Sequence, residues 1–86
     1  MARQMVVRSG ADLGAVIAEA RRQRGLTQEE LARSVNLDRT YLARVETGRS
    51  VLLLDRVFQF LRRLGVEVVV TLPGGSDVAA PEGDRA

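Results

Sequence analysis

The 86-residue sequence contains no cysteine and no histidine. Without these side chains the chain cannot form disulfides, the usual zinc sites with thiolate or imidazole ligands, or the nucleophile–base pairs of many hydrolases. Only carboxylate chemistry stays open to an enzyme, and the four acids of residues 26–49 all have capping, pairing or surface roles available. We therefore expect no enzymatic activity, no cofactor and no metal. The absence of cysteine also suits a reducing cytoplasm.

Long apolar runs are missing too. No stretch approaches the roughly 20 residues of a membrane span, and the first residues lack the apolar centre of a signal peptide. We expect a cytoplasmic protein with no membrane contact. A chain of 86 residues forms one domain near the lower limit for independent folding. Oligomerisation often supplies the stability that so small a core lacks, so a homodimer is expected.

The formal net charge of +2 is unevenly distributed. Residues 1–63 carry twelve arginines against seven acids, a balance of +5, whereas residues 64–86 carry one arginine against four acids, a balance of −3. All 13 basic residues are arginine, which forms bidentate contacts with phosphate and guanine. Compositional bias explains the lack of lysine better than function does, so only the positions of the arginines bear on function.

Residues 26–49, LTQEELARSVNLDRTYLARVETGR, have the pattern of two short helices joined by a tight turn. Thr27 and Glu30 have the spacing of a capping box, in which each side chain binds the backbone N–H of the other residue. This box predicts that the first of the two helices begins at Gln28. Such a pair of helices is the arrangement that places one helix across a DNA backbone and the next in the major groove.

The turn and the second helix have their own signals. Asn36 tolerates the left-handed conformation that ends a helix, Asp38 is an N-cap candidate, and Gly48 is a C-terminal stop. Leu42 and Val45 form the apolar stripe that should face the core. The residues left pointing outward are Arg39, Thr40, Ala43 and Arg44.

These residues resemble the Xre/Cro/repressor helix-turn-helix family, whose pattern contains TQEELA, a turn residue, a polar recognition helix and a closing E-x-G. The resemblance implies a mainly α, lambda-repressor-like domain of four to five helices that binds double-stranded DNA. The residues expected to read bases are Arg39, Thr40 and Arg44. The residues expected at the DNA backbone or groove rim are Gln28, Arg49, Arg24 and Tyr41, although Tyr41 could equally pack against the preceding helix.

A first helix is predicted over about residues 12–24, ending at Gly25, from apolar residues at helical spacing. In the family pattern Arg21 on this helix pairs with Glu46 of the E-x-G element, which would lock the first helix to the recognition helix. The alternative is that Arg21 is an ordinary surface arginine. The apolar residues that define this helix are Leu13, Val16, Ile17 and Ala20.

A last helix is predicted up to Gly65, with its apolar stripe forming a fourth wall of the core. Leu53 and Phe60 fall off this stripe, so they are either a subunit contact or ordinary exposed apolar residues. The stripe consists of Leu54, Val57, Phe58, Leu61 and Leu64.

Residues 66–72 are β-branched and bounded by Gly65 and Pro73, which predicts one strand. A lone strand needs a partner, and three are available: residues 5–8 of the same chain, the same strand of a second copy, or both. Pairing across a two-fold dimer would hold two recognition helices as a palindromic operator requires. The residues of this dimer strand are Val66, Val68, Val69, Val70 and Leu72.

The sequence thus divides into an arm or short edge strand at 1–10, a helix-turn-helix domain at 11–65, the strand at 66–72, and a tail at 73–86 expected to be disordered. The run Arg62-Arg63-Leu64-Gly65 followed by a valine-rich strand resembles the HipB-type antitoxins. That resemblance implies a HipA-type serine/threonine kinase toxin as partner. A stand-alone repressor and a helical interaction module that has lost DNA binding are the alternatives.

Overall fold

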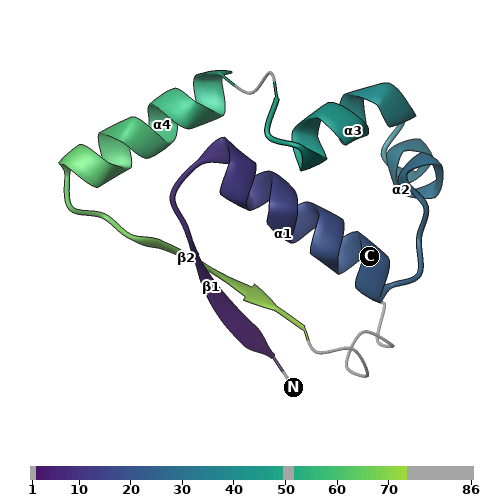
Figure 1. Ribbon diagram of the computed structural model, residues 1–86, viewed down its shortest axis with the longest axis horizontal. Coiled ribbons are helices and arrows are strands. Elements are labelled where there is room, and N and C mark those ends of the chain that lie inside the picture. Colours follow the sequence, from purple (N-terminus) through teal and green to yellow (C-terminus); the bar gives the residue numbers. More distant parts are fainter. Residues whose placement is uncertain (1, 50–51, 74–86) are drawn as a thin grey trace.

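The computed structural model describes residues 2–49 and 52–73. These residues form four helices with a strand at each end, which fits the predicted helix-turn-helix fold with a C-terminal strand. Helix α1 lies at the centre, with α2 and α3 on one side, α4 on the other, and the strands running alongside (Figure 1). Residues 74–86 of the expected tail lie outside the described part. The elements are β1 (Arg3–Val7), α1 (Gly10–Gln23), α2 (Gln28–Ser34), α3 (Arg39–Glu46), α4 (Leu52–Arg63) and β2 (Val68–Leu72).

Side-chain caps define where α1, α2 and α3 begin. The capping box is present: Thr27 Oγ1 accepts from the Glu30 N–H at 3.0 Å, and Glu30 Oε1 accepts from the Thr27 N–H at 2.8 Å. Asp38 caps α3 by accepting from the Thr40 N–H at 3.0 Å. Ser9 caps α1, which therefore begins at Gly10, two residues earlier than the apolar spacing predicts.

All four described helices end in the same way. A residue with positive φ follows each helix, and it is a glycine in three cases and Asn36, with φ of 61°, in the fourth. The next residue then donates its N–H to the carbonyl five positions earlier, as Leu37 does to Ala32 at 2.8 Å. This arrangement satisfies carbonyls that a helix end leaves free. The prediction that Asn36 makes the turn is confirmed.

The two strands pair antiparallel within one chain, with Val7 opposite Val68 and Arg3 opposite Leu72. The N-terminal segment is therefore an edge strand rather than a disordered arm. Strand β2 begins two residues later than predicted because the Val66 N–H donates to Leu61 O and completes the end of α4.

The core lies between the inner face of this sheet, α1 and α4. Val68 and Val70 pack against the buried cluster, whereas Val69 on the other face of the strand is exposed, as is Val66 before the strand begins. Val68, Val70 and Leu72 of the expected dimer strand therefore face the core of their own chain, because side chains alternate between the two faces of a strand. The buried members of the cluster are Val7, Val16, Phe58 and Leu72.

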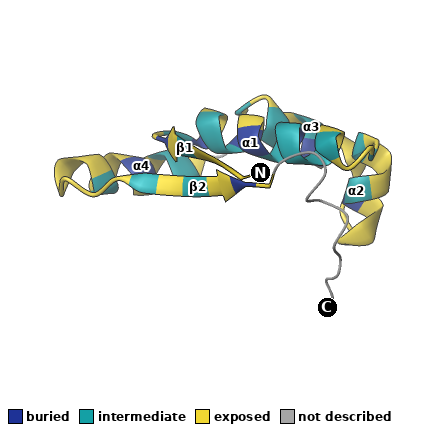
Figure 2. Cartoon of the chain, turned by 90° about the horizontal axis from the view of Figure 1, so that it is seen from below, coloured by how far each residue is buried: buried dark blue, intermediate teal, exposed yellow. Residues whose placement is uncertain are grey.

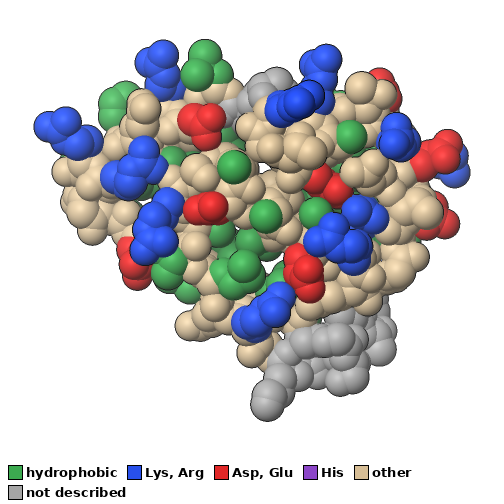
Figure 3. Space-filling model, viewed as in Figure 1, with side chains coloured by type: hydrophobic (Ala, Val, Ile, Leu, Met, Phe, Trp, Pro, Cys, Tyr) green, Lys and Arg blue, Asp and Glu red, His purple; other side chains and the backbone are tan. Residues whose placement is uncertain are grey.

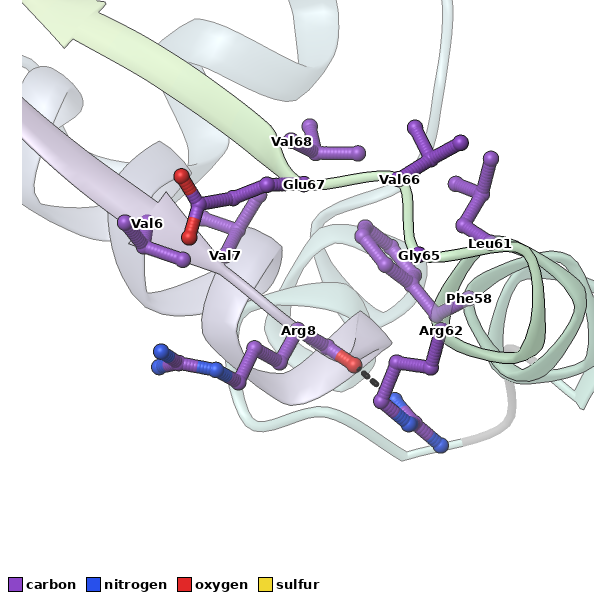
Figure 4. A pocket seen from close by; sticks show the side chains of 10 residues that line it. All are labelled: Val6, Val7, Arg8, Phe58, Leu61, Arg62, Gly65, Val66, Glu67 and Val68. Atoms are coloured by element: carbon purple, nitrogen blue, oxygen red, sulfur yellow. Dashed lines mark hydrogen bonds between the residues drawn. The ribbon is translucent and has the colours of Figure 1, made fainter.

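Helix α4 contributes less to the core than its apolar stripe predicts. Phe58 is buried, but Val57 and Leu64 are exposed. The molecule is flat when seen from the side (Figure 2). On one of its faces, apolar side chains are visible at the surface between α1, α4 and the sheet (Figure 3). A groove of about 300 Å³ lies where the sheet meets α4, and there Arg62 donates to the carbonyl of Arg8 (Figure 4).

Helices α1 and α3 touch through their backbones. Gly14 is buried on α1, and a Cβ placed there would lie 2.0 Å from the carbonyl oxygen of Val45. Only glycine permits so close an approach, so α3 is held directly against α1. None of the described helices is both long and apolar enough to cross a membrane.

Candidate nucleic-acid interface

The outer face of α3 carries a shallow basic groove. Helical spacing places Thr40 and Arg44 on the same side of α3, and the chain after the helix brings Arg49 beside them. Arg44 and Arg49 are both exposed. The groove has a volume of about 420 Å³ and is lined by Thr40, Ala43, Arg44, Thr47 and Arg49.

The other predicted DNA contacts lie outside this groove. Arg39 is exposed and lines a separate hollow together with Arg33 of α2. Tyr41 is 53% exposed, and Arg24 is exposed directly after α1. The structure therefore brings together three of the predicted contacts, Thr40, Arg44 and Arg49, and does not place the others in this groove.

Thr47 belongs to the groove although the sequence analysis did not select it. Its hydroxyl donates to Ala43 O at 3.1 Å and to Arg44 O at 3.2 Å. The sequence could have identified Thr47, because Thr40, Ala43 and Thr47 recur at the three- and four-residue spacing of one helical face.

Behind the groove, Arg21 and Glu46 form a nearly buried ion pair, with side chains 12% and 5% exposed. Arg21 Nε donates to Glu46 Oε2 at 2.7 Å, and Nη2 donates to Oε1 at 3.2 Å. Arg21 Nη1 also donates to Leu26 O at 2.8 Å. The pair joins the last turn of α1 to the last residue of α3.

Gln28 also binds this pair, which the sequence analysis did not anticipate. Its Nε2 donates to Glu46 Oε1 at 2.9 Å, and its side chain is half-buried. No spacing rule connects residues 28 and 46, because the contact depends on how α2 and α3 cross.

The pKa of the Glu46 carboxyl is set by opposing effects. Burial raises it, but the hydrogen bonds from Arg21 and Gln28 and the positive charges of Arg21 and Arg22 outweigh burial and lower the pKa below its ordinary value of 4.5. Glu46 is therefore ionised under ordinary conditions. No cluster of three or more acidic side chains suited to a metal ion occurs in residues 2–49 and 52–73.

Comparison with known sequences gives the family of this domain. A family model described as helix-turn-helix matches residues 17–70, more than half of the chain. The chain belongs to the helix-turn-helix family. Its matched part runs from α1 to β2 and includes both the groove and the ion pair.

Two relatives are similar over most of their length to this helix-turn-helix protein. An uncharacterized HTH-type transcriptional regulator, y4mF, from Sinorhizobium fredii (strain NBRC 101917 / NGR234) is 28% identical over 79% of this chain and 90% of its own. The ImmF control region 10 kDa protein of Bacillus phage phi105 is 37% identical over 83% of this chain and 88% of its own. No solved structure matches the chain significantly. Together with the fold, these matches support a DNA-binding regulator.

Replacing Glu46 by glutamine should lower the free energy of unfolding at pH 7 by about 3 kcal/mol, because the Arg21 guanidinium is left buried without a counter-charge. A carboxyl with a lowered folded pKa stabilises the protein above pH 4.5, and this stability is lost as the pH falls through the folded pKa. The difference in the free energy of unfolding between the wild-type protein and Glu46→Gln should therefore become smaller in acid. Urea unfolding at pH 7 and pH 3 measures both effects.

Glu29→Gln is the matched control, because Glu29 and Arg33 form an exposed ion pair, with side chains 67% and 73% exposed. Such pairs contribute little, so this variant should unfold within about 1 kcal/mol of the wild type at pH 7. Equal stability of the two variants at pH 7 would contradict the role given to Glu46.

Proposed function

We propose that this helix-turn-helix protein is a sequence-specific repressor that binds a palindromic operator as a homodimer, with α3 in the major groove. The groove formed by Thr40, Arg44 and Arg49 carries the proposal, because it brings the exposed cation of Arg49, just after α3, beside that of Arg44 on α3, the helix that the family lays against DNA. In this arrangement Arg39 and Arg44 bind guanine O6 and N7, and Thr40 contacts a neighbouring base.

The backbone contacts of the proposal come from residues around the groove. Arg49 and Arg24 are exposed cations that bind phosphates, and Tyr41 contacts the backbone or a thymine methyl at the rim. The Gln28 amide carries two N–H groups, so it can donate to a phosphate while it also binds Glu46. The acid at the end of α3 does not repel DNA, because Glu46 is buried and paired.

Changing Arg44 to alanine should reduce discrimination between the preferred duplex and random-sequence DNA by about 1–3 kcal/mol, because a bidentate contact to guanine is lost. Arg49→Ala should weaken binding to both kinds of DNA alike and make it less dependent on salt, because a phosphate contact is lost. Fluorescence anisotropy with duplexes selected by the wild-type protein from a random pool measures both.

Arg3→Ala is the matched control, since Arg3 is an exposed arginine on β1, outside the groove. It removes the same charge and should leave discrimination unchanged. If Arg44→Ala keeps the wild-type preference, then α3 does not read DNA through Arg44.

The dimer is proposed from the exposed apolar residues of α4. Its inner residues Leu54, Phe58 and Leu61 pack in the core, and a second stripe follows the spacing of four, three and four residues found in helix–helix seams. A seam with this spacing is complementary to itself, so a second copy fits it. The second stripe consists of Leu53, Val57, Phe60 and Leu64, which are 78%, 41%, 68% and 74% exposed.

The outer face of the sheet continues the exposed apolar surface. Val6 and Val69 are opposite each other in the sheet and both are exposed, and Val66 beyond them is exposed as well. The dimer strand of the sequence analysis is thus reduced to Val66 and Val69 as side chains that a partner can bury. Of the two edges of β2, one is taken by β1, so the other can pair across the dimer.

Phe60→Glu should convert the dimer to a monomer with an intact fold, because it places a charge in the seam at an exposed position. Sedimentation velocity measures the mass, and circular dichroism checks the fold. Val35→Glu is the control and should stay dimeric, because Val35 is an exposed apolar residue at the end of α2, away from α4 in the sequence. If the Phe60→Glu variant stays dimeric and a Val69→Glu variant is monomeric, the dimer interface lies on the sheet rather than on α4. A monomeric wild-type protein would overturn the dimer.

We also propose that the protein is an antitoxin of HipB type that represses its own operon and neutralises a kinase toxin. The support is the run from Arg62 to Gly65 leading into β2, since a strand does follow α4 at that place. Co-expression with the product of the adjacent open reading frame should yield a stable complex that abolishes autophosphorylation of that product. If the adjacent product has no kinase activity or does not bind, the antitoxin proposal fails and the protein is a stand-alone repressor.

A further inference from the structure

Three helices meet at the carboxylate of Glu46. Arg21 of α1 donates to both of its oxygens, and Gln28 of α2 donates to Oε1. The charged groups that act on Glu46 are Arg21 and Arg22, both on α1, whereas α2 contributes only the neutral amide of Gln28. Gln28 is the first residue of α2 and Glu46 is the last residue of α3. This hydrogen bond therefore links the beginning of α2 to the end of α3.

Helices α2 and α3 each bury a single residue. Ala32 is the buried residue of α2, and Leu42 is the buried residue of α3. The two helices have only 7 and 8 residues, too few to hold a fixed arrangement by backbone hydrogen bonds alone. A half-buried polar link from Gln28 at the beginning of α2 to Glu46 at the end of α3 can therefore help to fix the angle between the two helices.

We propose that Gln28 is a positioning residue that acts through Glu46 and sets the angle of α3 relative to α2. This angle decides where Arg44 points when α2 lies across the DNA backbone. The inference rests on the proposed function, because the angle has a consequence only in a protein that reads DNA through α3. This positioning role differs from a direct contact between Gln28 and a DNA phosphate, because a phosphate contact does not depend on the hydrogen bond from Gln28 to Glu46.

The link between Gln28 and Glu46 is tested without DNA by the variant Gln28→Glu. At pH 8 two carboxylates face each other, and Tm should fall by roughly 5 °C relative to the wild type. Near pH 5 one carboxyl of the pair holds a proton and donates as the amide does, so this deficit should shrink. Gln59→Glu makes the same change at an exposed glutamine of α4, and its Tm difference from the wild type should not depend on pH in this range.

The effect on DNA reading is tested by Gln28→Met, which keeps the length of the side chain and removes its donors. Binding is measured well below Tm, with the duplex selected by the wild-type protein and with poly(dI-dC). The ratio of the two affinities should fall by roughly tenfold, the effect of losing one hydrogen bond to a charged group. Gln59→Met is the control and should keep the wild-type ratio.

Each other outcome overturns the proposal. If Gln28→Met loses affinity for both DNAs equally and Gln28→Glu follows Gln59→Glu at every pH, then Gln28 is a phosphate ligand alone. If Tm responds but the affinity ratio does not, then the link is structural without positioning α3. If the wild-type protein selects no duplex, the proposed function fails and the positioning role fails with it, while the Tm comparison alone still decides whether Gln28 is linked to Glu46.

Discussion

The cost of burying the Glu46 carboxylate organises the DNA-binding half of the molecule. A carboxylate withdrawn from water costs several kcal/mol unless charged and polar donors replace its hydration. Here the donors come from Arg21 on α1 and Gln28 on α2, so satisfying one group fixes three helices relative to each other. The backbone contact between Gly14 and Val45 acts at the same junction through sterics rather than charge. The groove on α3 is therefore built on a rigid support.

The half formed by α4 and the sheet is held more weakly. A two-stranded sheet is marginal in water unless one face is covered, and here the inner face packs on α1 while Val6 and Val69 face outward. Helix α4 buries Phe58 but leaves a second apolar stripe exposed. In a domain near the lower size limit, this half has the most to gain from a partner. The two halves thus differ: a closed polar network supports α3, whereas α4 and the sheet leave apolar side chains exposed.

Features governed by residues close in sequence could be predicted. The Thr27–Glu30 capping box, the Asp38 cap and the left-handed turn at Asn36 each depend on backbone groups within a few positions, and each is present. Features that depend on how elements cross could not. The pairing of β1 with β2 was one of three open alternatives, because backbone donors and acceptors do not identify their partner strand.

Two other features could not be predicted from the sequence, again because they depend on how the elements pack. Apolar residues cover two neighbouring faces of α4, and periodicity alone does not say which face meets the core, so Leu64 was placed inside although it is exposed. The Arg21–Glu46 pair came from resemblance to a family pattern, whereas the contact from Gln28 to Glu46 has no signature in sequence spacing. Helix ends can thus be read locally, but the choice of partner for a buried polar group requires the packed structure.

Helix α1 connects the two halves, and its role follows from its contacts. Gly14 touches α3, and the N–H of Gly10 donates to Asp55 Oδ1 of α4 at 2.8 Å. Gly10 and Gly14 are about one helical turn apart, roughly 6 Å along the helix, so the first turns of α1 link α3 directly to α4. In the proposed dimer, the crossing of the two α4 helices would therefore determine the separation of the two α3 helices. Half-site spacing would then depend on α4, and the bases read within each half-site would depend on α3.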